Sequence, residues 1–378
     1  MATTTDQPRS VSAAEPAGKQ GHLAGARSKV IIVWAGIGLS MVLLQLWIFG
    51  SWLASGPEEI TRFRTPGSAT WWWAQIFQYA FLAIGVGAAI FYGRRCWQQR
   101  RITIEAMVLI GTLSIWWQDP LYNYFRPGFF YNSNMINRES WIEFIPGVVA
   151  PYGNLQVEPL LWGFGCYFAV MTLQIFIMVW ALRKLRDRWP NLNGLILFGI
   201  ISVLGFVMDA AMEMPMIHTR IYAYPAAWSH VALWGGTPFQ LPWLHFAEGA
   251  LFFAGCAALL VFRDDRGFTV VERGAAGIRS SRWRNVAQLL AIVGFVNVIS
   301  LAYCPLVQLQ ILHSDSFPQG FEPAQTNGWC GDQGQPYGPC PGPGVDIKVQ
   351  KPGVGHPHPS EIYRQFPFFQ TPQGGGKP

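Results

Sequence analysis

Residues 30–53 read VIIVWAGIGLSMVLLQLWIFGSWL, an apolar stretch without a single charged side chain. A helix of about 20 mostly apolar residues is long enough to cross the ~30 Å hydrocarbon core of a bilayer. Backbone N–H and C=O groups find no water inside lipid, so a segment that crosses must pair them internally as a helix. The stretch Val30–Leu53 therefore predicts a transmembrane helix and sets the class of the whole chain.

Six further apolar runs follow this one. They are Ala69–Gly93, Ile102–Trp117, Val157–Leu182, Leu192–Pro215, Leu241–Phe262 and Val286–Leu312. The run at 102–117 is the weakest, because it is short and carries Glu105 near one end. The pattern predicts an all-α fold, a polytopic membrane helix bundle with seven transmembrane helices.

The composition argues against two other classes of protein. Of the 378 residues, 51% are hydrophobic, 15% are aromatic and only 13% are charged, whereas an average soluble domain is about 25% charged. So much apolar and aromatic surface excludes a disordered chain and an ordinary soluble enzyme. We expect a multi-pass protein of the cell membrane.

The positions of the basic residues predict the orientation. Arg and Lys concentrate before the first run and in the connections at 94–101, 183–188 and 263–284, while the other connections and the C-terminal tail together hold about half as many. Because basic loops stay in the cytoplasm, we expect the N-terminus inside and the C-terminus outside. The formal charge of +6 then follows from topology, and we expect no nucleic-acid partner.

The two ends of the chain differ from its middle. Residues 1–29 are polar and small and predict a disordered cytoplasmic N-terminus ahead of a membrane domain at 30–312. Residues 313–378 are rich in Gly, Pro and Gln, which predicts an irregular extracytoplasmic tail. Cys330 and Cys340 in that tail either form a disulfide in an oxidising compartment or remain two free thiols.

Four ionisable residues inside the apolar runs are candidates for catalysis. Asp209 and Glu213 form an i,i+4 pair on one predicted helix. His245 and Glu248 form an i,i+3 pair on the next, so each pair shares one helix face. At about 1.5 Å per residue, the two pairs lie at matching depths below the outer surface. Because an ionisable group is costly inside a span, we expect the four to share one cavity.

The chemistry expected of such a cavity is proton transfer. Neighbouring carboxyl groups in an apolar site resist double ionisation, so one serves as a general acid and another as a general base. We assign these two roles to Asp209 and Glu213. Glu248 and His245 are expected to assist them, and Asp119 is expected at the mouth of the cavity.

The same cluster fits two non-catalytic roles. In the first, the four side chains only hold two helices together through hydrogen bonds. In the second they bind a metal ion, although His245 and Glu248 lack the H-E-x-x-H order. The six cysteines include no C-x-x-C pair and indicate no structural zinc site. We therefore expect no metal and no cofactor.

The long aromatic segment at 118–156 is expected to fold over the outer mouth of the bundle. Candidate substrate-binding residues lie in this segment, at the outer ends of the runs and in the loop between the fifth and sixth runs. They are Gln75, Trp72, Tyr122, Asn123, Tyr131, Glu158, His218, Tyr224 and His230. For Trp72 the alternative is the aromatic belt at the membrane surface. For Gln75 the alternative is a bond to a neighbouring helix.

Four short stretches carry a resemblance to a known family. They are DPLYNYFRPGFFYNSN at 119–134, EPLL at 158–161, RDDRG at 263–267 and VERG at 271–274. The first is the most specific. Over about residues 26–312 the chain resembles the family of the avermectin-pathway spirocyclase, the AveC-like membrane proteins.

The resemblance implies a polytopic membrane protein that closes a dihydroxy-ketone into a spiroketal with loss of water, or dehydrates a related compound. It suggests a polyketide or another lipophilic hydroxy-ketone as substrate, and this reaction requires no redox cofactor. It carries over no catalytic residues, so the site assignment rests on the predicted helices. Protonation of an oxygen and capture by a hydroxyl suit a paired acid and base.

Two functions of different classes remain open. One is a lipid-binding receptor or transporter without chemistry, whose buried acids bind a ligand or relay protons. The other is a membrane cyclase that acts on an isoprenoid through the same acidic cavity. In each case the partners are a lipophilic small molecule and membrane lipid. A receptor releases its ligand unchanged, so the mass of the product separates it from either enzyme.

Overall fold

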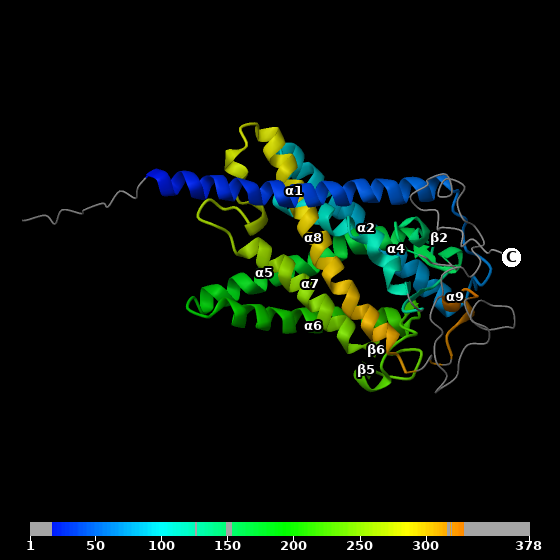
Figure 1. The fold of residues 1–378 in the computed structure, drawn as a ribbon. Coiled ribbons are helices and arrows are strands. Elements are labelled where there is room, and N and C mark those ends of the chain that lie inside the picture. The colour runs from blue at the N-terminus through cyan, green and yellow to red at the C-terminus, as the bar shows by residue number, and fades with distance from the viewer. Residues whose placement is uncertain (1–16, 125–126, 149–152, 316–317, 319, 329–378) are drawn as a thin grey trace, which may run out of the picture.

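The computed structural model describes residues 17–124, 127–148, 153–315, 318 and 320–328 (Figure 1). The chain is mostly helical. Its long helices are α1 (Ala17–Ala54), α2 (Ala69–Gln99), α6 (Gly194–His218), α7 (Trp243–Val261) and α8 (Ser281–Leu312). One further long helix joins three labelled parts without a break, α4 (Leu160–Gly165), the π-helical turn η4 (Cys166–Val170) and α5 (Met171–Arg188).

Among the described residues, six helices are long and apolar enough to cross a membrane. Their outward faces are apolar as well, and Leu46 on α1 and Leu195 on α6 are 65% and 81% exposed. Large apolar side chains on the outside are expected of helices that lie in lipid and would be unusual on a soluble protein. The expected class, an all-α chain with helices of membrane length, is therefore confirmed.

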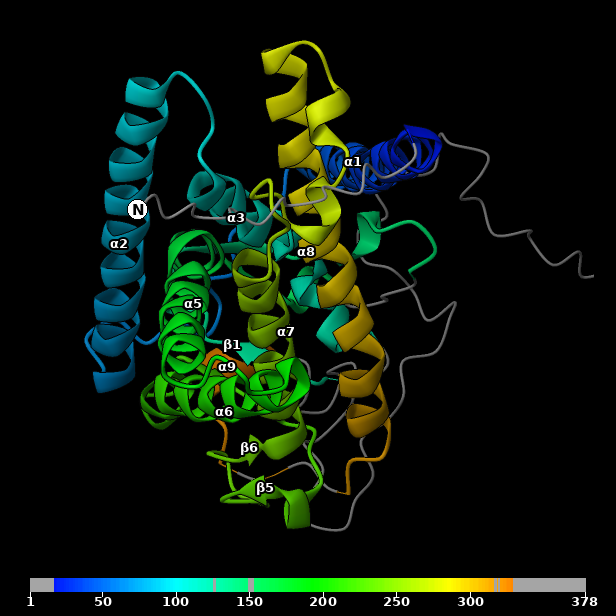
Figure 2. The same cartoon turned by 90° about the vertical axis from the view of Figure 1, so that its left-hand side faces the viewer.

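The third expected span, Ile102–Trp117, is not a long helix, and the predicted count of seven transmembrane helices is not confirmed. Thr103 caps α3 (Ile104–Leu113), which has ten residues. The chain then continues as the 3-10 helix η1 (Trp116–Asn123). Most side chains of α3 are buried, and Figure 2 shows α3 between α2 and α8. The apolar run at 102–117 is thus buried by protein, and hydropathy cannot distinguish such burial from lipid.

Both ends of the described chain depart from the expected boundaries. Helix α1 begins at Ala17, so residues 17–29 are helical. In the tail, the short helix α9 (Pro323–Thr326) packs against the protein, and Gln325 is buried. Cys330 and Cys340 lie outside the described residues, so their disulfide remains a prediction.

Polar caps mark where three of the long helices begin. Ser68, Asn193 and Ser280 each accept a backbone N–H from the first turn of α2, α6 and α8 respectively. Such caps satisfy donors that the helix itself leaves unpaired. The loops of the chain therefore set the ends of these helices.

Helices α1 and α8 cross in direct backbone contact. A Cβ atom at Gly38 would lie 1.9 Å from Leu290 O, and one at Gly294 would lie 2.5 Å from Trp34 O. Only glycine at these positions allows the two helices to approach so closely. The contact holds α1, which is otherwise largely exposed, against the bundle.

Short strands gather at the end of the bundle opposite the start of α1 (Figure 1). They form three antiparallel pairs: β1 (Phe130–Tyr131) with β4 (Tyr222–Ala223), β2 (Asn137–Glu139) with β3 (Val157–Pro159), and β5 (Ala232–Leu233) with β6 (Leu241–Pro242). The 3-10 helices η2 (Ile142–Phe144), η3 (Gly153–Leu155) and η5 (Ser229–Val231) occur in the same connections, whereas η6 (Val270–Glu272) and η7 (Ala275–Gly277) occur between α7 and α8. We call the three strand pairs the strand layer.

Candidate functional site

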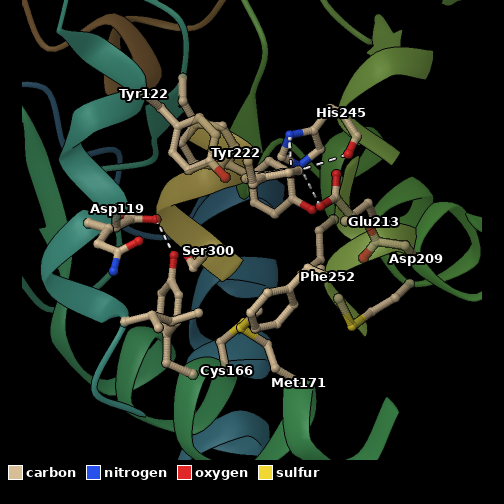
Figure 3. Close-up of a pocket in the computed structure, with 18 of the residues that line it drawn as sticks. Asp119, Tyr122, Cys166, Met171, Asp209, Glu213, Tyr222, His245, Phe252 and Ser300 are labelled. Carbon is tan, nitrogen blue, oxygen red and sulfur yellow. Dashed lines mark hydrogen bonds and ion pairs between the residues drawn. The ribbon is translucent and has the colours of Figure 1, made fainter. Parts of the chain in front are cut away.

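A pocket lies between the helices and the strand layer (Figure 3). It holds about 920 Å³ of space between atoms, its opening included. The lining is mostly aromatic and apolar, and it includes four titratable groups that the sequence singles out, Asp119, Asp209, Glu213 and His245.

Glu213 of α6 and His245 of α7 meet at one side of this pocket. Glu213 Oε1 lies 3.4 Å from His245 Nε2. The hydroxyl of Tyr224 donates to Glu213 Oε2 at 2.7 Å. Both oxygens of the Glu213 carboxyl therefore have a polar partner, although the side chain is only 11% exposed.

The second ring nitrogen of His245 faces α8. Its Nδ1 lies 3.1 Å from the hydroxyl of Tyr303, which also donates to the backbone carbonyl of His245 at 3.2 Å. Polar contacts therefore run without a break from Tyr224 through Glu213 and His245 to Tyr303. This arrangement fixes the ring and gives a proton a path between the two nitrogens of the imidazole.

Asp119 lies on the opposite side of the pocket from this pair (Figure 3). Its Oδ1 accepts a hydrogen bond from Tyr131 at 3.1 Å and a second from Tyr167. Asp119 is itself buried. The pocket therefore places a carboxyl group with two phenol donors opposite a carboxylate–histidine pair.

Tyr167 reaches the pocket because its helix is irregular. The π-helical turn η4 adds a residue to one turn of the helix, so the neighbours Cys166 and Tyr167 both line the pocket. Trp162 and Met171 line it from the adjacent turns. Turns of this kind are frequent at functional sites.

Asp209 lines the same pocket one helical turn from Glu213. A Cβ atom at Gly249 of α7 would lie only 2.6 Å from Asp209 Oδ2. The glycine therefore leaves room for the carboxyl group between α6 and α7. Any larger residue at position 249 would have to displace it.

Glu248, the fourth member of the expected cluster, does not line the pocket. Helix α7 turns His245, Gly249 and Phe252 toward the pocket, and at about 100° per residue Glu248 falls to one side of them. There it lies near Tyr303 and Cys304 of α8, and its buried Oε2 has no hydrogen-bond partner within the described part of the chain. The structure thus brings together three of the four expected groups.

The candidate substrate-binding residues divide into two sets. Tyr122, Tyr131 and Tyr224 line the pocket. The others that were expected to contact a substrate, Gln75, Trp72, Asn123, Glu158, His218 and His230, are absent from its lining.

Three members of the second set are bonded within the protein. Gln75 donates to Asn134 O at 2.9 Å, Asn123 Oδ1 accepts the backbone N–H groups of Gly128 and Phe129 at 2.9 Å, and Glu158 is buried and accepts from Ser140. Polar side chains in a loop over an apolar bundle satisfy backbone groups first.

The remaining three, Trp72, His218 and His230, are exposed on the outside. The ring of Trp72 fits an aromatic belt at the membrane surface, which was the alternative to a substrate contact. His218 stacks on Phe239 and its Nδ1 lies 2.9 Å from Met214 O. None of the three faces the pocket.

Three pocket tyrosines, Tyr167, Tyr222 and Tyr303, are missing from the residues that the sequence predicts for the site. A signal for two of them exists, because Tyr167 and Tyr303 lie inside apolar runs, where a buried hydroxyl needs a partner. Tyrosine is also common at membrane surfaces, which weakens that signal.

Within the described part of the chain, no three His, Cys, Asp or Glu side chains are grouped as metal ligands. The absence of a metal therefore stays a prediction. The chemistry that the lining supports is proton transfer between carboxyl, imidazole and phenol groups.

Comparison with known proteins gives one match. The family model described as "Spirocyclase AveC-like" matches residues 99–327, more than half of the chain. No curated protein and no solved structure matches the sequence. The matched region contains η1, the strand layer and α4 to α9, and therefore most of the elements that line the pocket.

Proposed function

We propose, from the premise that this chain belongs to the AveC-like spirocyclase family, that it is a membrane enzyme which closes a lipophilic dihydroxy-ketone into a spiroketal and releases water. One observation carries the proposal. In a single aromatic pocket, Asp119 with its two phenol donors lies opposite the Glu213–His245 pair.

The reaction is balanced by proton transfer alone. One substrate hydroxyl adds to the ketone carbon, a C–O bond forms, the hydroxyl proton passes to a base, and the carbonyl oxygen takes a proton from an acid. The hemiketal hydroxyl then takes a second proton and leaves as water, which creates an oxocarbenium ion. The second hydroxyl closes on that carbon and releases its proton, so protons given and taken are equal.

The two sides of the pocket suit the two halves of this cycle. Glu213 takes the protons that the two substrate hydroxyl groups release. His245, next to Glu213, relays protons toward Tyr303. Asp119 delivers protons to the oxygen that departs. A positioned acid and base each contribute roughly 10²–10⁴-fold to a rate.

The rest of the lining supports the same proposal. The aromatic rings of Phe129, Tyr222 and Phe252 line the pocket, and their π electrons stabilise an oxocarbenium ion. Cys166 and Met171 form an apolar side of the pocket (Figure 3), which accommodates the alkyl chains of the substrate. A site poor in water also protects the cation from premature hydrolysis.

The test uses membranes that contain the protein and a long-chain δ,δ′-dihydroxy-ketone as probe. Mass spectrometry should show loss of one water at a rate well above that of membranes without the protein. We expect Glu213→Gln and Asp119→Asn each to lower turnover at least ~100-fold. Glu105→Gln on α3 is the matched control, because Glu105 is absent from the pocket lining.

Two results would contradict the proposal. Recovery of the probe unchanged, although bound, would assign the protein to a receptor or transporter. Full turnover in both site variants would place the chemistry elsewhere in the molecule.

A further inference from the structure

Gln118 of η1 lines the pocket and directly precedes Asp119 in the chain. Its side chain is 5% exposed, so the protein encloses it almost completely. The amide oxygen, Oε1, is buried and has no hydrogen-bond partner among the described residues. Buried polar atoms nearly always have a partner, and one without a partner needs an explanation. The oxygen of Gln118 is therefore a point at which the folded chain lacks a donor.

The bonding partners of Gln118 determine which end of its amide is the oxygen. Gln118 Nε2 lies 3.0 Å from Asn297 Oδ1 on α8, and the indole nitrogen of Trp117 lies 2.9 Å from the same atom. An indole N–H only donates, so the atom of Asn297 that it reaches must be the oxygen. An amide oxygen only accepts, so Gln118 must present its NH₂ group to Asn297.

Asn297 is held in this orientation from its other end as well. Its Nδ2 donates to Ser114 Oγ at 2.7 Å and to Val293 O at 2.9 Å. Both N–H groups are thus used and the oxygen accepts two bonds, so this buried side chain is fully paired. Neither Asn297 nor Trp117 lines the pocket. The nitrogen of Gln118 is tied to residues outside the lining, and its oxygen is the end that remains for a ligand.

The missing partner must bring an N–H or O–H group, because an amide oxygen only accepts. A cationic N–H group would pair more strongly with the carboxyl groups of the same pocket, which belong to Asp119, Asp209 and Glu213. A neutral hydroxyl group fits the neutral amide. The mostly apolar lining suits the alkyl part of such an alcohol.

We propose that Gln118 Oε1 binds a hydroxyl group of a long-chain alcohol and selects for ligands that carry one. A buried acceptor discriminates against a ligand that cannot donate, because the acceptor then stays unpaired. In the proposed function this group is one of the two hydroxyls of the dihydroxy-ketone, held by the residue next to Asp119. That identification rests on the proposed function, whereas the hydroxyl site itself does not.

Binding to the purified full-length protein in detergent tests the site without any chemistry. The first probe is the dihydroxy-ketone with a CH₂ group in place of the ketone, which cannot form a ketal. The second is the same diol with fluorine in place of each hydroxyl, since fluorine is similar in size and cannot donate. Isothermal titration calorimetry gives the ratio of the two Kd values. In Gln118→Met this preference for the diol should fall roughly 10-fold, the effect of one hydrogen bond.

Two variants of Gln118 and one of Gln310 complete the test. Gln118→Leu also removes the oxygen and should act like Gln118→Met, so the result does not depend on the folding of one variant. Gln118→Glu retains an oxygen and should keep the preference. Gln310 on α8 is equally buried, and its Oε1 likewise lacks a partner within the described structure, but it is absent from the pocket lining. Gln310→Met should therefore keep the wild-type ratio.

An unchanged ratio in folded Gln118→Met or Gln118→Leu overturns the proposal, and it is the result expected if only a water molecule pairs with the oxygen. An equal loss of preference in Gln310→Met overturns it too, because the effect would then not belong to the pocket.

Turnover of the dihydroxy-ketone probe tests whether the bound hydroxyl belongs to the substrate. Gln118→Met should raise KM roughly 10-fold and lower kcat far less than Asp119→Asn does, because the contact exists before the reaction as well as during it. An unchanged KM overturns the identification with the substrate. If the wild-type protein turns over no ketone, the proposed function fails. Binding of the diol still decides the hydroxyl site in that case, so the two failures are distinguishable.

Discussion

A single hydroxyl group, that of Tyr224, fixes one oxygen of Glu213 at one side of the pocket. Tyr224 is 5% exposed, so its loss would leave that buried oxygen without this donor. A hydrogen bond to a charged group contributes about 1.5–3 kcal/mol. We therefore expect Tyr224→Phe to lower turnover of the ketone probe roughly 10- to 150-fold while the protein stays folded.

The control for this variant is Tyr79→Phe, which removes the same hydroxyl from an exposed position on α2. It should turn over the probe at the wild-type rate. Equal activity of Tyr224→Phe and Tyr79→Phe would show that the orientation of Glu213 does not depend on Tyr224.

Three ionisable residues of the pocket could be located from the sequence, because burial of a charged side chain is costly. Asp209, Glu213 and His245 stand out in apolar runs for this reason, and the structure gathers them around one pocket. Glu248 lies slightly to one side of the face of α7 that carries His245. The i,i+3 spacing of the two residues is too coarse to predict that difference in direction. The place of Tyr167 in an apolar run was a signal, but the direction of its side chain could not be foreseen, because a π-helical turn changes the phase of its helix.

At the scale of the elements, the crossing of α1 and α8 depends on glycine. Gly38→Ala would place a Cβ atom 1.9 Å from Leu290 O, and because that obstacle is backbone, the helices would have to separate. Overpacking of this kind typically costs about 1–3 kcal/mol. We expect Gly38→Ala to lower the thermal stability of the protein in detergent, measured by unfolding of the purified protein.

Gly36→Ala provides the matched comparison on the same helix. Apart from its chain neighbours and the backbone of its own helix, no atom of the described residues lies within 4 Å of the position that its Cβ would occupy. It should leave thermal stability unchanged or slightly improve it, since alanine favours helix. A similar loss of stability in both variants would exclude close packing as the cause.

Hydropathy located the helices that face lipid. It gave a wrong prediction for a helix whose apolar surroundings are other parts of the protein. The six long helices all fall on expected runs, although their ends shift by several residues. The run at 102–117 is equally apolar, but α3 ends at Leu113 and packs inside the bundle. The strand layer has no hydropathy signal, because its strands contain only two or three residues each.

At the scale of the whole molecule, contacts between distant segments close the end of the bundle that carries the strand layer. Glu322, just before α9, accepts a hydrogen bond from Thr70 of α2 at 3.0 Å and lies 3.5 Å from Arg220, which follows α6. Asn327 donates to Tyr131 O at 3.3 Å. The region just after α8 therefore belongs to the folded unit and braces the strand that carries Tyr131.

Helix α1 begins and helix α8 ends at opposite ends of the bundle. Figure 1 shows the start of α1 at the same end as the α5–α6 and α7–α8 connections, whereas α8 ends near the strand layer. Six passages alone would return the chain to its starting side. Helices α3 and η1 have ten and eight residues, which rise about 15 Å and 16 Å and together match the ~30 Å bilayer core. We expect their course through the protein interior to supply the odd passage.

This geometry predicts which loops share a side of the membrane. The basic α5–α6 connection should face the cytoplasm, so Asn191→Cys should react with a membrane-impermeant thiol reagent only after lysis. Glu58→Cys before α2 and Thr237→Cys between β5 and β6 should both react on intact cells, with the unmodified protein as background. If α3 and η1 did not carry the chain through, Glu58 and Thr237 would lie on opposite sides, and only one of these two variants would be labelled from outside.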